Sequence, residues 1–199
     1  MSTPPIAARL SSALHWRQAA LMLSFLFPVM EACAEKADSL KKTELSAEYT
    51  VIDGKKNTTT LSGNVELSRG TLVVRAHRAV ASVTAEKTRA FLLDGEAGEQ
   101  VFFRQKRDGG PDLWLEGRAD HLEYDEKTEQ VKFISKAKVQ YLEGDRVTQE
   151  QTGEFLSYDS LNDVFVAANS NSGKHVPGGG RVKLTIEPKV EPKTEKKPK

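Results

Sequence analysis

The sequence has one cysteine, Cys33, and few aromatic residues: two Trp, four Tyr and eight Phe among 199 residues. A single cysteine excludes an intramolecular disulfide, so burial and strand pairing must supply the free energy of folding. The longest apolar run, Ala19 to Met30, is shorter than the about 20 residues that a membrane-spanning helix needs. Apolar residues at sustained helical spacing are also missing, apart from a short turn expected near Ala34 to Leu45, which argues against a helical domain.

Motifs of catalysis and of metal binding are missing as well. His77, His121 and His175 have no Cys, His or carboxylate partner at a recognised ligand spacing. No serine lies in a G-x-S-x-G nucleophile motif. Acidic pairs such as Asp125-Glu126 fall in expected turns, where Asp bonds to nearby backbone groups. We therefore predict no catalytic residues, no metal site and no cofactor.

The N-terminal residues have the pattern of a secretory signal peptide. Arg9 and Arg17 precede the apolar run, and Ala32-Cys33-Ala34 follows it as a cleavage site of the A-x-A type. We expect residues 1–34 to be removed on export. Two alternatives stay open at this point, an uncleaved membrane anchor and lipidation of Cys33.

The charge of the expected mature chain is balanced. The whole sequence has 29 basic and 28 acidic residues, and removing Arg9, Arg17 and Glu31 leaves 27 of each sign. A nucleic-acid partner selects a basic surface, so we expect none.

Most of the mature chain alternates apolar and polar side chains, which is the pattern of β-strands with one buried face. The candidate strands are rich in Val, Leu, Phe, Tyr and Thr. They are residues 51–53, 58–67, 71–83, 90–94, 100–106, 113–116, 119–124, 130–135, 137–142, 146–149, 153–158 and 163–168.

Turn signals separate these strands at intervals of roughly 8 to 12 residues, which is typical of an all-β sandwich or barrel. Asp53-Gly54 and Asp94-Gly95 are examples. The segments 119–131 and 153–164 resemble each other as strand, Asp-led turn and strand. Ribbons with one apolar face are stable when two such faces meet, so we predict two facing sheets about 10 Å apart.

The composition changes near Gly173. We expect residues 35–172 to form the β-domain and residues 173–199 to be a flexible segment rich in Gly, Pro and Lys, in which residues 181–186 are a candidate for one last strand.

The order of short motifs resembles a known family. Leu61-Ser62-Gly63-Asn64-Val65-Glu66-Leu67 is followed by Gly70-Thr71-Leu72-Val73-Val74-Arg75-Ala76, then by Asp94-Gly95, Val101-Phe102-Phe103 and Glu116-Gly117-Arg118-Ala119-Asp120. This order is similar to that of the lipopolysaccharide-transport protein A family, whose domain is also called the organic-solvent-tolerance A type. The departures are Ser135-Lys136-Ala137, where the family often has Gly-Asn, and a longer turn after Lys106.

The resemblance implies an open, twisted β-jelly roll made of two facing antiparallel sheets with about sixteen short strands. It also implies a location in the periplasm and a role in carrying lipopolysaccharide, through its lipid A part, from the inner to the outer membrane. Protomers of the family join head to tail. Their partners are an inner-membrane anchored jelly-roll protein and an outer-membrane translocon.

By analogy with the family, apolar side chains of the two sheets would line a lipid groove: Leu45, Val65, Leu67, Leu72, Val74, Phe102, Leu122, Tyr124, Val131, Phe133, Val139 and Tyr141. Strands at the two ends would form the joints between protomers. These joint residues are Leu45, Ala47, Tyr49 and Val51 at one end and Phe155, Ser157, Tyr158, Val164 and Val166 at the other.

Three points stay open on the sequence alone. Arg75, Arg78 and Arg104 have two interpretations, contact with lipid phosphates or solvated charges at the rim. The same alternation of side chains also fits a secreted scaffold or carbohydrate-binding sandwich with a closed core. A periplasmic hydrolase is the third class, because short strands can assemble a site that no motif reveals.

Overall fold

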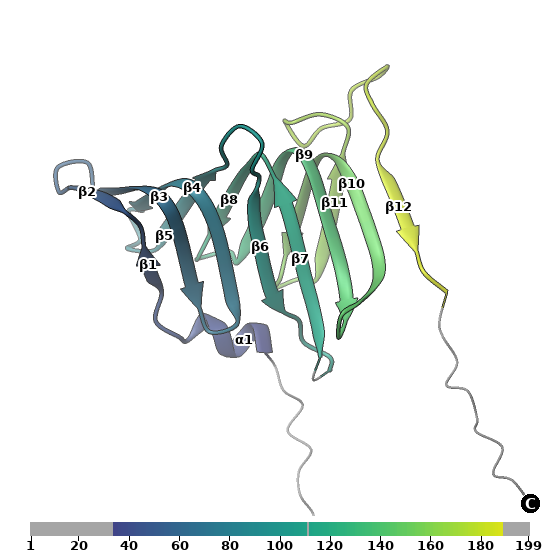
Figure 1. Ribbon diagram of the computed structural model, residues 1–199, viewed down its shortest axis with the longest axis horizontal. Coiled ribbons are helices and arrows are strands. Elements are labelled where there is room, and N and C mark those ends of the chain that lie inside the picture. Colours follow the sequence, from purple (N-terminus) through teal and green to yellow (C-terminus); the bar gives the residue numbers. More distant parts are fainter. Residues whose placement is uncertain (1–33, 111, 189–199) are drawn as a thin grey trace, which may run out of the picture. The chain divides into compact units, whose positions relative to one another are not determined.

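The computed structural model describes residues 34–110 and 112–188, which form one short helix and twelve strands (Figure 1). The elements are α1 (Ala34–Ser39), β1 (Glu44–Ser46), β2 (Tyr49–Asp53), β3 (Thr58–Arg69), β4 (Leu72–Val83), β5 (Arg89–Asp94), β6 (Val101–Lys106), β7 (Leu113–Ala119), β8 (His121–Asp125), β9 (Gln130–Glu143), β10 (Arg146–Asp159), β11 (Val164–Ala168) and β12 (Lys183–Ile186).

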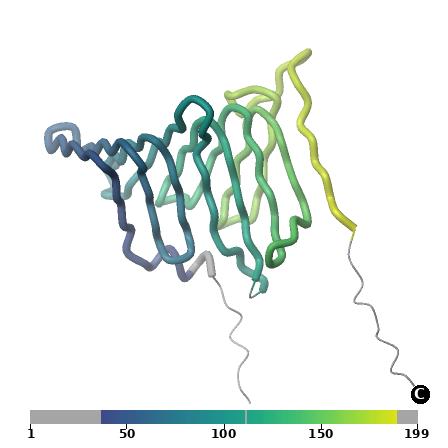
Figure 2. The backbone as a smooth tube through the Cα atoms, viewed as in Figure 1, coloured from purple at the N-terminus to yellow at the C-terminus, as the bar shows by residue number. Residues whose placement is uncertain are grey.

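The strands form one continuous, antiparallel hydrogen-bonded sheet that is folded into two layers (Figure 2). β3, β4, β9 and β10 are long and bent, so each contributes one half to either layer. The front layer has β1, β6, β7, β12 and four of these halves. The back layer has β2, β5, β8, β11 and the other four. Because four of the twelve strands serve both layers, the fold has sixteen strand segments.

Two of the four bends, those of β3 and β9, coincide with residues in the left-handed backbone region. In β3 these are Gly63, with a φ of 77°, and Asn64, with a φ of 45°. In β9 they are Ser135 and Lys136, with φ angles of 68° and 51°. Gly63 relieves the steric cost of this conformation, and Asn tolerates it better than most residues. The departure at Ser135-Lys136-Ala137 therefore marks a corner within one strand. The expected strands 130–135 and 137–142 form one continuous strand, β9, and the expected strands 146–149 and 153–158 form β10.

The corners lie in one hydrogen-bonded row. Glu48 donates its backbone N–H to Gly63 at 3.0 Å, Gly95 donates to Asp120 at 3.0 Å, and Asp120 donates to Ser135 at 3.0 Å. We call this side of the fold the corner edge. It contains the crossings between layers that the described residues make, including the β5–β6 and β7–β8 connections.

The opposite side, which we call the free edge, has only turns that return to their own layer within the described ranges. The β3–β4, β6–β7 and β9–β10 turns belong to the front layer, and the β4–β5, β8–β9 and β10–β11 turns belong to the back layer. The two layers are therefore joined by backbone along one side and meet through side chains along the other.

The core fills the space between the layers. Phe103 and Phe133 meet edge to face with ring centroids 5.5 Å apart, and Phe91 and Tyr124 stack at 6.1 Å. The buried cluster comprises Leu61, Val65, Leu67, Leu72, Val74, Ala79, Ala81, Phe91, Leu93, Val101, Phe103, Leu115, Ala119, Leu122, Tyr124, Val131, Phe133, Ala137, Val139, Leu156 and Tyr158. These residues alternate with polar ones along each strand, so the predicted two-faced ribbons and the jelly-roll class are confirmed.

The structure describes more of the expected C-terminal segment than of the expected signal peptide. The expected signal peptide lies outside the described residues except for Ala34, which begins α1, so it stays a prediction. Towards the C-terminus, β12 pairs with β10, from Gln149↔Ile186 to Thr152↔Lys183. The sheet therefore continues past the expected boundary at residue 172, as the candidate strand at 181–186 indicated. The part of the chain that the structure describes contains no helix that could span a membrane.

Candidate functional site

The space between the layers is lined by the residues that sequence alternation selected, with one exception. Nine of the predicted groove residues lie on the inner faces and are buried: Val65, Leu67, Leu72, Val74, Leu122, Tyr124, Val131, Phe133 and Val139. Leu45 and Tyr141 are half-buried and pack against this cluster. Whether any of these side chains binds lipid stays a prediction.

The centre of this interior is closely packed around Phe133. A Cβ atom added to Gly117 would lie 2.1 Å from Cε1 of Phe133, so glycine is required there to make room for the ring. Phe91, Phe103 and Phe133 are among the largest side chains that are fully buried. The inner faces therefore touch each other here, and a guest between them has to displace these contacts.

The exception is Phe102, whose placement in the groove is wrong. Phe103 points into the core and is 1% exposed, whereas Phe102 lies on the outer face of β6. The sequence contained the signal, because Phe102 shares its parity with Arg104 and Lys106, while Phe103 shares its parity with Val101. Charged neighbours on the same face of a strand indicate the solvent side.

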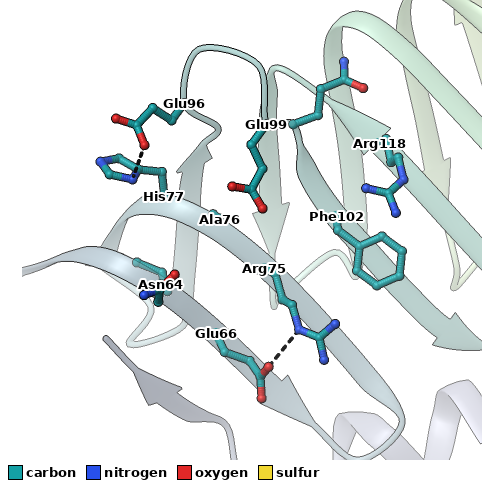
Figure 3. A pocket seen from close by; sticks show the side chains of 11 residues that line it. Asn64, Glu66, Arg75, Ala76, His77, Glu96, Glu99, Phe102 and Arg118 are labelled. Carbon is teal, nitrogen blue, oxygen red and sulfur yellow. Dashed lines mark hydrogen bonds and ion pairs between the residues drawn. The ribbon is translucent and has the colours of Figure 1, made fainter. Parts of the chain in front are cut away.

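Phe102 instead contributes to a shallow polar pocket on the outer surface (Figure 3). The guanidinium carbons of Arg75 and Arg118 lie 5.9 and 4.7 Å from its ring centroid. Around the ring, Arg75 pairs with Glu66 at 2.9 Å and His77 pairs with Glu96 at 3.1 Å (Figure 3). The pocket thus places two arginines against one aromatic ring, with two ion pairs beside it.

The arginines whose role the sequence left open have carboxylate partners or lie at the surface. Arg75 pairs with Glu66, and Arg104 donates to Glu116 at 2.7 Å and covers the Trp114 ring at 4.2 Å. Arg78 is exposed on β4 at the corner edge. These positions favour solvated surface charges over contacts with a guest between the layers.

The predicted joint residues fall into two groups. Tyr49 and Val51 lie on β2 and Val164 and Val166 on β11, and both strands are paired on one side only among the described residues. Leu45 lies on β1, another edge strand, and Ala47 follows it.

The other group is misplaced. Phe155, Ser157 and Tyr158 lie on β10, whose second half is already paired with β9 and with β11. Ser157 and Tyr158 are buried at 7% and 3% exposure. Their backbone groups are taken up within the sheet, so assigning them to a joint is wrong, and the edge at this end belongs to β11 and β12.

A polar cluster that sequence reasoning missed lies at the free edge. Arg69, at the end of β3 in the front layer, donates from Nη2 to the hydroxyl of Tyr124 in the back layer. Its Nη2 lies 3.9 Å from Oε1 of Glu129, and the side chains are 5% and 11% exposed. Burial raises the pKa of Tyr124 above its ordinary value, so the hydroxyl stays protonated. Arg69 shares the parity of Val65 and Leu67, which was the available signal that it points inward.

Further contacts bridge the layers along the same edge. Thr43, just before β1, donates to Glu126 after β8 at 2.8 Å. Arg107, which follows β6, approaches Asp163 before β11 at 3.8 Å, and its guanidinium covers the Tyr141 ring at 4.4 Å. The buried Nε atoms of Arg69 and Arg107 have no hydrogen-bond partner.

Helix α1 lies at this edge as well. Asp38 is 3% exposed, and its carboxylate accepts the backbone N–H of Thr71 at 2.8 Å and also the Thr71 hydroxyl. This caps the β3–β4 turn, in which Gly70 has a φ of 62° and passes so close to Asp38 that a Cβ would overlap the carboxylate.

His77 and His121 each have one carboxylate partner at the surface. His77 pairs with Glu96, and His121 pairs with Asp94 at 2.8 Å. Across the described ranges, no three His, Cys, Asp or Glu side chains come together in a way that could hold a metal ion.

Comparison with known families decides the classification. A family described as "LptA/(LptD N-terminal domain) LPS transport protein" matches residues 44–163, which run from the start of β1 to the β10–β11 turn. The chain belongs to this LptA/LptD N-terminal family. The resemblance inferred from motif order is thereby confirmed, and the matched region contains both the inner-face cluster and the group of Arg69, Tyr124 and Glu129 at the free edge.

Individual relatives are similar to the chain in sequence or in fold. The chain is 25% identical over 145 residues to the lipopolysaccharide export system protein LptA of Haemophilus influenzae, covering 73% of this chain and 80% of the relative. Its fold is similar to the crystal structure of LptH from Pseudomonas aeruginosa, described as the LptA-homologous periplasmic component of a lipopolysaccharide transport device. The TM-score is 0.64 with 17% identity, covering 76% of this chain and 99% of LptH.

Proposed function

We propose that this LptA-family chain is a periplasmic carrier that binds lipopolysaccharide between its two layers and joins copies of itself head to tail, so that the lipid moves from the inner to the outer membrane. The family and the named roles of the relatives support the transport class. The assembly and the direction of transport are part of the proposal.

The apolar interior explains what such a carrier contributes. Each CH₂ group left in water costs about 0.8 kcal/mol, so one acyl chain of about 12 carbons would cost on the order of 10 kcal/mol to move unshielded. An interior lined by Leu67, Leu72 and Phe133 removes this cost without any chemical step. Binding alone does no net work, so directed movement needs an energy source elsewhere in the system.

The main support for head-to-tail assembly is that an unpaired strand lies at each end of the apolar interior. Among the described residues, β1 and β2 pair only with β3, while β11 and β12 pair only with β10. Edge strands are normally protected, because they template pairing with another chain. Here they keep apolar side chains exposed: Tyr49, Val51, Ile52, Val164, Val166, Leu184 and Ile186. Two different edges favour a head-to-tail assembly by strand addition.

Two neighbouring positions test lipid binding directly. A photo-crosslinking residue at position 103 should capture lipopolysaccharide, whereas the same residue at position 102 should not, because the two side chains face opposite sides of β6. Equal capture at both positions, or none at either, would contradict the carrier role. As partners we propose an inner-membrane anchored jelly-roll protein and an outer-membrane translocon, each docking at one of the two ends.

The packed centre favours one alternative, a secreted scaffold or carbohydrate-binding sandwich with a permanently closed core. Phe91, Phe103 and Phe133 are fully buried, as they would be in such a core. This alternative predicts a strict monomer at high concentration and no binding of acylated ligands. The carrier predicts concentration-dependent association and lipid-dependent exposure of the inner faces.

A further inference from the structure

The backbone connections of the two layers are asymmetric. The bent strands and the β5–β6 and β7–β8 connections cross between layers at the corner edge, where hydrogen bonds tie each corner to the next. At the free edge, the described turns stay within one layer. Separating the layers at the free edge therefore breaks side-chain contacts and no strand pairing, whereas separating them at the corner edge would break the sheet itself.

Three polar contacts close the free edge between the layers. They are Thr43 with Glu126, Arg107 with Asp163, and the buried group of Arg69, Tyr124 and Glu129, which we call the latch. The contacts are spaced along the edge from β1 to β11. They hold the edge shut over the apolar interior, and each can open without unfolding a strand.

Arg69 is an incompletely satisfied cation. A guanidinium group has five N–H donors and can accept a planar, two-oxygen partner. In the latch it has one tyrosine hydroxyl, one carboxylate oxygen at the limit of an ion pair, 3.9 Å away, and an Nε–H without a partner. Burying a charge is unfavourable unless it is paired and hydrogen-bonded. An anion with several oxygens would satisfy Arg69 better than Glu129 does.

We infer that the free edge is the entry route for the acyl chains, and that Arg69 exchanges Tyr124 and Glu129 for a phosphate group of the glycolipid once the layers part. Phosphate fits because it offers several acceptor oxygens to the guanidinium fork. The acyl chains then occupy the space between the layers, and the phosphorylated sugars remain at the edge. This inference rests on the proposed lipid carriage and adds its route and its headgroup contact.

A cross-layer staple tests the route. In the full chain with Cys33→Ser, the pair Arg107→Cys and Asp163→Cys is joined by a short bis-maleimide. The pair Glu143→Cys and Arg146→Cys, within one hairpin of the front layer, is the control. The probe is fluorescent, bisphosphorylated, hexa-acylated lipid A.

Stapling across the layers should slow loading about tenfold or more relative to the unstapled double variant, and the hairpin staple should leave loading unchanged. Equal loading with and without the cross-layer staple would overturn the entry route while leaving lipid carriage intact. No loading of the unstapled protein would overturn the proposed function, and the entry route with it.

The preference between phosphorylated and dephosphorylated lipid A tests the proposed contact of Arg69 with a phosphate group. The unmodified chain should prefer bisphosphorylated over dephosphorylated lipid A by about tenfold, Arg69→Gln should lose this preference, and Arg69→Lys should keep part of it. Glu129→Gln, which removes the competing carboxylate, should strengthen the preference. Because this second variant keeps Arg69, it tests the phosphate contact even where Arg69→Gln fails to fold. Equal binding of both lipids by the unmodified chain would overturn the phosphate contact. Displacement of the lipid by millimolar inorganic phosphate would instead assign the site to free phosphate.

Discussion

Asp120 and Ser135 are held together twice at the corner edge: the Asp120 backbone N–H donates to the Ser135 carbonyl at 3.0 Å, and the Ser135 hydroxyl donates to the Asp120 carboxylate at 2.9 Å. Gln100 and Lys136 also reach this carboxylate, each at 3.1 Å. One side chain therefore fastens the β7–β8 crossing to the bend of β9.

This arrangement predicts a pH dependence of stability. Hydrogen bonds from Gln100 and then Ser135 hold the pKa of Asp120 below its ordinary value of 3.8. A carboxyl group whose pKa is lowered by folding contributes stability above its ordinary pKa, and this contribution is lost as the pH falls through the lowered value. Asp120→Asn should therefore cost about 1–2 kcal/mol at pH 7 and progressively less below about pH 4.

Urea unfolding from pH 3 to pH 7 measures this difference. Asp145→Asn, in the exposed β9–β10 turn, is the matched control and should change the free energy of unfolding by no more than about 0.5 kcal/mol. A constant gap between Asp120→Asn and the unmodified chain across the whole pH range would contradict the role assigned to the carboxylate.

The two faces of β6 predict opposite costs for neighbouring truncations. Phe103→Ala removes a fully buried ring that packs on Phe133 and should lower the free energy of unfolding by about 3–5 kcal/mol. Phe102→Ala removes a half-buried ring between two arginines and should cost at most about 1 kcal/mol. Denaturant titration at neutral pH compares the two, and similar losses would mean that the face assignment is incorrect.

Gly117 should tolerate no side chain. Gly117→Ala places a methyl group against the Phe133 ring, so we expect a loss of about 1–3 kcal/mol from overpacking. Gly54→Ala, where nothing lies within 4 Å of the added atom, is the control. Thermal unfolding of both variants checks the prediction. A neutral Gly117→Ala would show that Phe133 moves aside easily, which would weaken the description of a close-packed centre.

The edge strand β11 should control self-association. Val166→Lys adds a charge to an exposed apolar position at this edge and should weaken association about tenfold or more. Leu92→Lys is matched in exposure, 51% against 44%, but lies on β5, which is paired on both sides. A concentration series by sedimentation or scattering compares them. Equal weakening by both variants would point to a general surface effect and away from a joint at β11.

Alternation and turn residues were enough to predict the strands and most of the inner face. Val65, Leu67 and Val139 are placed correctly because a period of two leaves only two choices. Phe102 was misassigned because the two adjacent phenylalanines had to face opposite sides, and the charged residues on the face of Phe102 were not used to choose between them. The one-faced ribbons predicted two facing sheets, and the family resemblance supplied the open jelly roll.

What the sequence could not supply depends on distant pairing. The pattern gave short strands on both sides of Ser135, but their union into one bent strand depends on contacts with β7, β8 and β10. The misplacement of Tyr158 has the same origin in part, because its strand pairs with β11 across the Asp-led turn but also with the more distant β9, which leaves β10 no unpaired side there. Arg69 carried an inward parity, yet its partners Tyr124 and Glu129 lie 55 and more positions along the chain.

Nearly every strand pairs with one that is close to it in the sequence: β2 with β3, β3 with β4, β4 with β5, and β9 with β10. Such a sheet can grow outward from its first hairpins without waiting for the last residues. A polypeptide that emerges with its N-terminus first can therefore assemble in the order in which it emerges. Each new hairpin pairs with the edge strand that formed before it. Among the described strands, only the first, β1 and β2, and the last, β11 and β12, are left with an unpaired side for another molecule.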